Sequence, residues 1–163
     1  MTLKISESML DVLMYLFENY METNCEISRS HDELVEELEE AGFYEENIHK
    51  AFIWLEELSA MQDASDVLAN HQSSAERVYD DYEYEKFGSE GIGLLHFLQQ
   101  IGVLNTLTRE LVIDRALALE GDKIETARLK WVVLMILFSY PGQDAQLAWM
   151  EEFILNNREQ TIH

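Results

Sequence analysis

The sequence predicts an all-α protein, a compact bundle of about seven helices in two packed helical lobes around a central apolar helix at about residues 129–140. Three observations support this prediction. The stretch from Trp131 to Phe138 is apolar on every side, which is typical of a helix in the middle of a bundle. The chain of 163 residues contains only one proline and seven glycines, too few for a turn-rich β fold. Elsewhere, apolar residues recur every three or four positions, the period of an amphipathic helix.

The central apolar stretch is too short to cross a membrane. As a helix, residues 131–140 span about 15 Å, roughly half of the hydrocarbon thickness of a bilayer. Arg128 and Lys130 directly precede the stretch, and Pro141 follows it. We therefore expect a core helix and no membrane partner.

Three amphipathic helices are expected in the N-terminal part of the chain. Ser30 is a good N-cap for the second helix and predicts a capping box with Glu33. Gly42 supplies the left-handed residue that ends this helix. We predict that the three helices form an N-terminal lobe over residues 1–61. They are predicted at about residues 8–21, 32–41 and 45–60.

The segment that follows is polar and lacks a sustained apolar period. Asp, Ser, Ala, Asn and Gln dominate residues 61–75. This composition is typical of a connection between structural units. We predict a linker at residues 62–76 and a C-terminal helical lobe at residues 77–163.

The C-terminal lobe is predicted to begin with a short helix that Asp80 or Asp81 caps and that Gly88 interrupts. The next helix contains Gly91 and Gly93, which lack side chains and allow a neighbouring backbone to approach closely. Besides the central helix, the longer helices of this lobe are predicted at about residues 90–101, 106–119 and 144–156.

Two capping signals flank the connection that leads to the central helix. Thr106 or Thr108 is predicted to cap the helix before this connection. Gly121 is predicted to stop that helix, and Asp122 with Glu125 then resembles a capping box for the central helix.

The net charge of −21 arises from 32 acidic and 11 basic residues, and it is unevenly distributed. Residues 1–108 hold 23 acidic and 5 basic side chains, a net charge of −18. Such a field repels nucleic-acid phosphates and anionic lipids and attracts basic partners. The acidic face of the second helix is either an ordinary solvated surface or the docking surface of a basic protein. Its residues are Glu36, Glu37, Glu39 and Glu40.

The residues that could carry out chemistry form no recognisable catalytic arrangement. Five histidines and the single Cys25 give no nucleophile–base pair. The Glu46-x-x-His49 spacing found in di-iron bundles occurs here without a second copy. We therefore predict a non-enzymatic protein with no cofactor, metal ion or small-molecule substrate. Because no signal-peptide pattern opens the sequence, we expect a cytoplasmic protein.

An alternative function uses the charge-balanced stretch 109–130, which holds five acidic and five basic residues. Residues 108–130 could form a helix-turn-helix-like pair, and its basic side chains could contact the phosphates of DNA or RNA. A regulator of DNA or RNA processing is thus the second hypothesis, although the acidic neighbours favour ordinary ion pairs. The basic residues are Arg109, Arg115, Lys123, Arg128 and Lys130.

Several segments along nearly the whole chain resemble the bacterial Smg family. The resemblance implies a proteobacterial, cytoplasmic protein whose role is not established, and it carries over no catalytic residues. The segments are Met9–Glu18, Ala41–Phe43, Trp54–Glu56, Arg109–Leu119, Leu129–Met135 and Pro141–Gly142.

Overall fold

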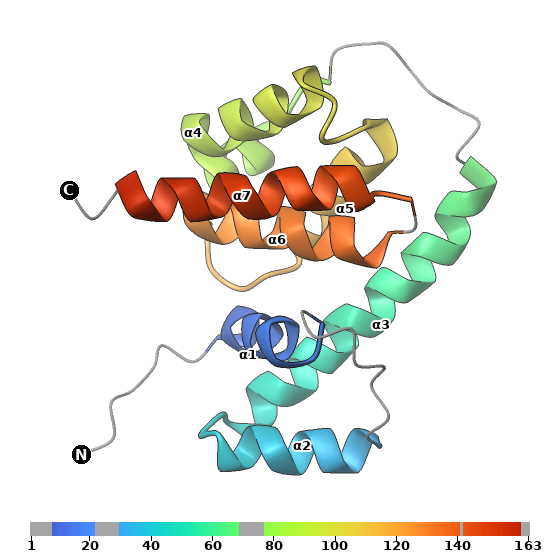
Figure 1. Ribbon diagram of the computed structural model, residues 1–163, viewed down its shortest axis with the longest axis vertical. Coiled ribbons are helices and arrows are strands. Elements are labelled where there is room, and N and C mark those ends of the chain that lie inside the picture. The colour runs from blue at the N-terminus through green and yellow to red at the C-terminus, as the bar shows by residue number, and fades with distance from the viewer. Residues whose placement is uncertain (1–7, 22–29, 69–76, 141, 161–163) are drawn as a thin grey trace. The chain divides into compact units, whose positions relative to one another are not determined.

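The computed structural model describes residues 8–21, 30–68, 77–140 and 142–160 (Figure 1). These residues form seven α-helices and one short π-helix, with no β-strand among them. The predicted all-α fold is therefore confirmed. The chain divides into two compact units, Met1–Ser59 and Ala60–His163. The predicted lobes and the linker at 62–76 stay a prediction, and part of that linker lies outside the described residues.

The N-terminal unit begins with α1 (Met9–Leu16), which continues as the π-helix η1 (Phe17–Met21). The carboxylate of Asp11 accepts a hydrogen bond from the Ser8 N–H at 3.1 Å and so helps to start the helix. A helix is therefore present where residues 8–21 predict one, but it changes from α to the wider π geometry after Leu16. Four residues of α1 and the first of η1 are at most 4% exposed, namely Leu10, Val12, Leu13, Leu16 and Phe17.

The second helix, α2 (His31–Glu40), begins at the predicted cap. The Ser30 hydroxyl accepts the Glu33 N–H at 3.3 Å. Leu34 and Leu38 are the buried positions of α2. The chain leaves the helix through Gly42, whose φ of 105° is unfavourable for residues with a Cβ atom.

The third helix, α3 (Glu45–Leu68), is longer than predicted. The sequence predicts an end near Ala60, where the apolar period fades, and this prediction is wrong. Residues 61–68 contain no glycine or proline and include methionine, glutamine, alanine and leucine, which are good helix formers. In the N-terminal unit, α3 buries a stripe at helical spacing, formed by Ile48, Ala51, Trp54 and Leu58.

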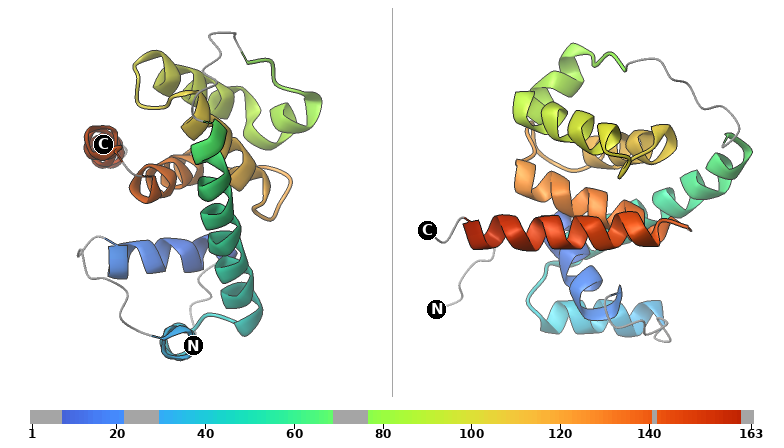
Figure 2. Two further views of the ribbon diagram at one scale, coloured as in Figure 1. Left: turned by 90° about the vertical axis from the view of Figure 1, so that its right-hand side faces the viewer. Right: turned by 45° about the horizontal axis from the view of Figure 1, so that its top comes forward.

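The C-terminal unit is organised around α6 (Thr126–Ser139). This helix contacts α4 (Asp81–Gln100), α5 (Thr106–Leu117) and α7 (Asp144–Gln160), and α7 runs alongside it (Figure 2). Six consecutive residues, Val132 to Leu137, are at most 3% exposed. Such burial on every side confirms the predicted central apolar helix of this unit.

The helix α4 consists of two segments that meet at Gly88, where φ is 68° and ψ is 172°. The predicted interruption is therefore present. A Cβ atom on Gly91 would lie 3.0 Å from the Cβ of Phe87 and 3.4 Å from Cδ2 of Leu129. The absence of a side chain at Gly91 thus lets α4 approach α6. The same expectation for Gly93 is wrong, because a Cβ there would meet no atom within 4 Å.

The N-cap of α4 is the residue that the sequence predicts, whereas the N-caps of α5 and α6 differ from the prediction. Asp80 caps α4, since its carboxylate accepts the Glu83 N–H at 2.8 Å. The N-cap of α5 is Asn105, and Thr108 is its capping-box partner at the third helical position. Glu125 occupies the N-cap of α6 without a side-chain cap, so the predicted box with Asp122 is wrong. The last helix, α7, also extends past the predicted end at residue 156.

Candidate functional site

The acidic face of α2 lies opposite its buried residues. Leu34 and Leu38 are 6% and 1% exposed, whereas Glu36, Glu39 and Glu40 are exposed and Glu37 is half-buried. Glutamates on successive turns repel one another because residues three or four apart are neighbours on a helix surface. This face therefore concentrates negative charge at some cost to the stability of α2, and a cation bound there would relieve the repulsion.

Two of the five predicted basic residues are buried in the C-terminal unit. Arg109 and Arg115 are 6% and 5% exposed. The Arg109 guanidinium donates from Nη1 to Oε1 of Gln99 at 2.9 Å and from Nε to Oε2 of Glu110 at 2.8 Å. Arg115 donates from Nε and Nη2 to Oδ2 of Asp114 at 3.1 and 2.7 Å. Both guanidinium groups therefore serve intramolecular pairs.

The other three predicted basic residues are more exposed than Arg109 and Arg115. Lys123 is exposed, while Arg128 and Lys130 are half-buried. The Lys130 ammonium lies 5.0 Å from the centre of the Phe153 ring, within the range of a cation–π interaction.

The predicted helix-turn-helix-like pair corresponds to α5, the connection 118–125 and α6. This connection has eight residues by the bounds of the two helices, whereas DNA-binding helix-turn-helix motifs use three or four. In addition, the burial of Val132–Leu137 leaves that part of α6 without an exposed face that could enter a groove.

An ion-pair network that the sequence did not predict joins the start of α4 to α5. Arg77 donates from Nη1 and Nη2 to the two carboxylate oxygens of Glu83, at 2.9 and 2.7 Å. Its Nε donates to Oε2 of Glu110 at 2.7 Å, the oxygen that also accepts from Arg109. The Arg77 guanidinium lies 4.7 Å from the centre of the Tyr79 ring. The network thereby fixes the segment that leads into α4.

The ionisation of this network follows from its geometry. The hydrogen bonds from Arg77 lower the pKa of Glu83, although burial opposes this effect. The hydrogen bond to Glu83 is also the main cause that raises the pKa of Arg77. Burial raises the pKa of Tyr79, and the charge of Arg77 offsets part of this rise. At neutral pH, Glu83 is therefore ionised, Arg77 is protonated and Tyr79 is uncharged. These fixed charge states suit a structural role.

A second unpredicted feature is the buried lysine of α4. Lys86 is 2% exposed, and its ammonium donates to the main-chain carbonyls of Leu119 and Gly121, each at 2.6 Å. The Lys86 carbonyl in turn accepts the Ile124 N–H at 2.9 Å. Burial lowers the pKa of Lys86, and the nearby charge of Asp122 opposes this shift. Lys86 therefore ties α4 to the connection between α5 and α6.

Among the residues that the structure describes, no three or more His, Cys, Asp or Glu side chains are grouped so that they could hold a metal ion. No described helix combines the length and the apolar character that spanning a bilayer requires.

Comparisons with known proteins give a consistent result. The model of the family described as "Protein of unknown function (DUF494)" matches residues 9–163. The Protein Smg homolog of Nitrosococcus oceani is 43% identical over 159 residues, which cover 98% of this chain and 100% of the relative. The Protein Smg homolog of Vibrio parahaemolyticus is 44% identical over 158 residues, covering 95% of this chain and 99% of the relative. No solved structure matches the chain.

Proposed function

The chain belongs to the DUF494 family, which includes the Smg homologs, and we propose that it is a non-enzymatic adaptor that docks a basic protein partner in the bacterial cytoplasm. The observation that carries this proposal is the acidic face of α2. Six of the ten residues of α2 are acidic and none is Lys or Arg, so the helix does not neutralise its own charge. A basic protein would both be attracted to this face and relieve its internal repulsion.

The burial of the ionisable side chains in the C-terminal unit supports a role without chemistry. Glu83, Lys86 and Arg109 are each at most 6% exposed and bond to side-chain or main-chain groups of the same unit. A catalytic acid or base must reach the substrate, directly or through one water molecule. These buried groups are therefore better explained as parts of the framework that holds α4 and α5.

The alternative function, a regulator of DNA or RNA processing, has weaker support. Arg109 and Arg115 are buried in ion pairs, and the pair of helices has a long connection and a largely buried second helix. A nucleic acid would also have to approach a chain with a net charge of −21.

Capture from the native cytosol with two charge-matched variants tests the proposal. The first variant, Glu36→Gln/Glu39→Gln/Glu40→Gln, removes three exposed charges from α2. The control, Asp81→Asn/Glu85→Gln/Glu125→Gln, removes three exposed charges from the C-terminal unit.

We expect the wild type and the control to retain a basic protein at low salt and to release it at high salt, because salt screens exposed charges. The α2 variant should lose this partner at both salt concentrations. An α2 variant that retains the partners of the wild type would overturn the proposal. Retention of nucleic acid that nuclease treatment removes would support the alternative function.

A further inference from the structure

Three aromatic rings from two helices, two of them exposed and one half-buried, form a cluster in the C-terminal unit, which we call the aromatic cluster. It consists of Phe97 on α4 and Trp149 and Phe153 on α7. The ring centres of Trp149 and Phe153 are 5.0 Å apart, and that of Phe97 lies 6.3 and 6.2 Å from them. Phe97 is 42% exposed and Trp149 is 37% exposed. Large aromatic side chains are therefore gathered at the surface.

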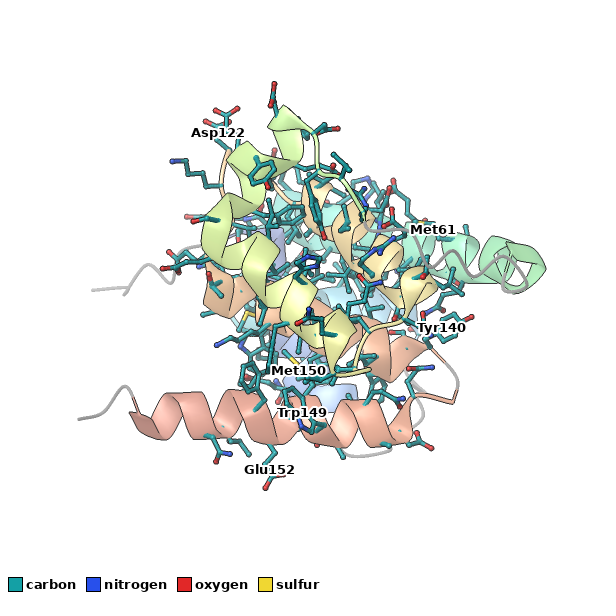
Figure 3. All side chains as sticks on the ribbon, turned by 90° about the horizontal axis from the view of Figure 1, so that it is seen from above. Met61, Asp122, Tyr140, Trp149, Met150 and Glu152 are labelled. Carbon is teal, nitrogen blue, oxygen red and sulfur yellow. The ribbon has the colours of Figure 1, made fainter. Side chains whose placement is uncertain are left out.

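The helix α7 does not need the rings of the aromatic cluster to anchor it in the core of the unit. The helix α7 already anchors itself through Met150, which is 0% exposed and points toward the rest of the unit in Figure 3. Leu98, beside Phe97, is likewise 0% exposed. One turn beyond Phe97, Ile101 is 45% exposed and extends the apolar surface along α4. Exposed apolar patches with polar surroundings often mark interaction sites, and aromatic residues are enriched there.

The charges around the aromatic cluster indicate what kind of partner would fit it. Glu152 is exposed on α7 three residues after Trp149, so the two are neighbours on the helix surface, and Glu152 points away from the unit in Figure 3. The ammonium of Lys130 lies 5.0 Å from the centre of the Phe153 ring, which shows that a ring of the cluster accepts a cation. A partner that combines Lys or Arg with apolar side chains would thus satisfy the Glu152 carboxylate, the net charge of −21 and the rings.

We infer that the aromatic cluster is a docking surface for a basic, amphipathic segment of a protein partner. This inference rests on the proposed function, because it assumes that the partner is basic. Anionic membranes and nucleic acids fit poorly, since the chain carries a net charge of −21. A second copy of the chain also fits poorly, because it would carry the same net charge of −21 and be repelled.

The test uses the full chain and a synthetic amphipathic peptide of leucine and lysine. A second peptide of the same pattern has glutamate in place of lysine. Binding is measured by fluorescence anisotropy, and two-dimensional NMR follows the indole N–H signals of the three tryptophans. Trp149→Ser and, independently, Phe97→Ser truncate the cluster. Tyr82→Ser is the matched control, because Tyr82 is a 63% exposed aromatic residue of α4.

We expect the lysine peptide to bind and to shift the Trp149 indole signal. Each cluster variant should weaken binding by about tenfold or more, as expected for a central aromatic anchor, and the control by less than about twofold. The glutamate peptide should not bind. Far-ultraviolet circular dichroism checks that each variant is folded.

Three results would overturn the inference. The first is binding of the lysine peptide that neither cluster variant weakens. The second is equal loss of binding in the Tyr82→Ser control. The third is a concentration-dependent dimer that Trp149→Ser abolishes in sedimentation, which would assign the surface to a second copy. The triple variant of α2 separates the two proposals. If it alone abolishes peptide binding, the inference about the cluster fails while the proposed function stands.

Discussion

Replacing Glu83 by glutamine should destabilise the protein and change its response to acid. The Glu83 carboxylate accepts two hydrogen bonds from Arg77, at 2.9 and 2.7 Å, and one from the Asp80 N–H at 3.0 Å. Its side chain is 8% exposed and that of Arg77 is 20% exposed, so solvent screens the pair only in part. Glutamine has one oxygen acceptor and no charge. Because charge-assisted hydrogen bonds contribute about 1.5–3 kcal/mol each, we expect Glu83→Gln to lower the free energy of unfolding by about 2 kcal/mol at pH 7.

The pH dependence gives this prediction its sharpest test. The pKa of Glu83 lies below its ordinary value of 4.5 in the folded state, mainly because of Arg77. A carboxylate with a lowered pKa contributes stability above the unfolded pKa, and this contribution is lost as the pH falls through the folded pKa. The difference between wild type and variant should therefore be constant above about pH 5 and shrink as the pH falls below 4.5.

Urea unfolding followed by circular dichroism between pH 7 and pH 3 measures this difference. Glu85→Gln is the matched control, since Glu85 is exposed on the same helix and should change stability by less than about 0.5 kcal/mol. A difference below about 0.5 kcal/mol at pH 7 for Glu83→Gln would refute the role assigned to the pair. A difference that stays constant down to pH 3 would refute the assignment of the lowered pKa.

The further predictions concern packing and capping, and each is measured as a change in the urea midpoint. Gly91→Ala should destabilise the protein by about 1–3 kcal/mol, because the new Cβ would lie 3.0 Å from that of Phe87. Gly93→Ala should instead stabilise it by about 0.5–1 kcal/mol, since that position is open and helical. Equal effects of the two variants would contradict the close packing of Gly91 against Phe87 and Leu129. Ile136→Ala should cost about 3 kcal/mol, because Ile136 is 0% exposed, and a loss below about 1 kcal/mol would argue against a central α6. Ser30→Ala should cost about 1 kcal/mol through loss of the α2 cap, and Ser30→Asp should restore it.

The features that could be predicted from the sequence are those that local chemistry determines. The run from Val132 to Leu137 is apolar on every side, and such a helix has no alternative to a buried position. Gly88 interrupts α4 because it adopts a positive φ, and Ser30 and Asp80 cap helices through residues three positions away. In each case, the partners lie within a few residues along the chain.

The features that were missed depend on distant partners or on competing local signals. Arg77 and Glu110 are 33 residues apart, as are Lys86 and Leu119, so neither pairing leaves a periodic signal. The cap of α5 was misplaced by one or more residues because Asn105, Thr106 and Thr108 are all good capping residues. The proposed acidic surface of α2 and the predicted basic residues stay predictions that binding experiments must decide.

The buried amine of Lys86 also provides a built-in reporter of local opening. Amine-acylating reagents attack only an unprotonated, solvent-accessible lysine, whereas the Lys86 ammonium is enclosed and bonded to the carbonyls of Leu119 and Gly121. Its rate of acylation should therefore follow how often the connection between α5 and α6 detaches from α4. The exposed Lys123 on the same connection would supply the reference rate within one molecule. A single mass-spectrometric time course would then show whether binding of a partner slows the detachment of the connection between α5 and α6 from α4.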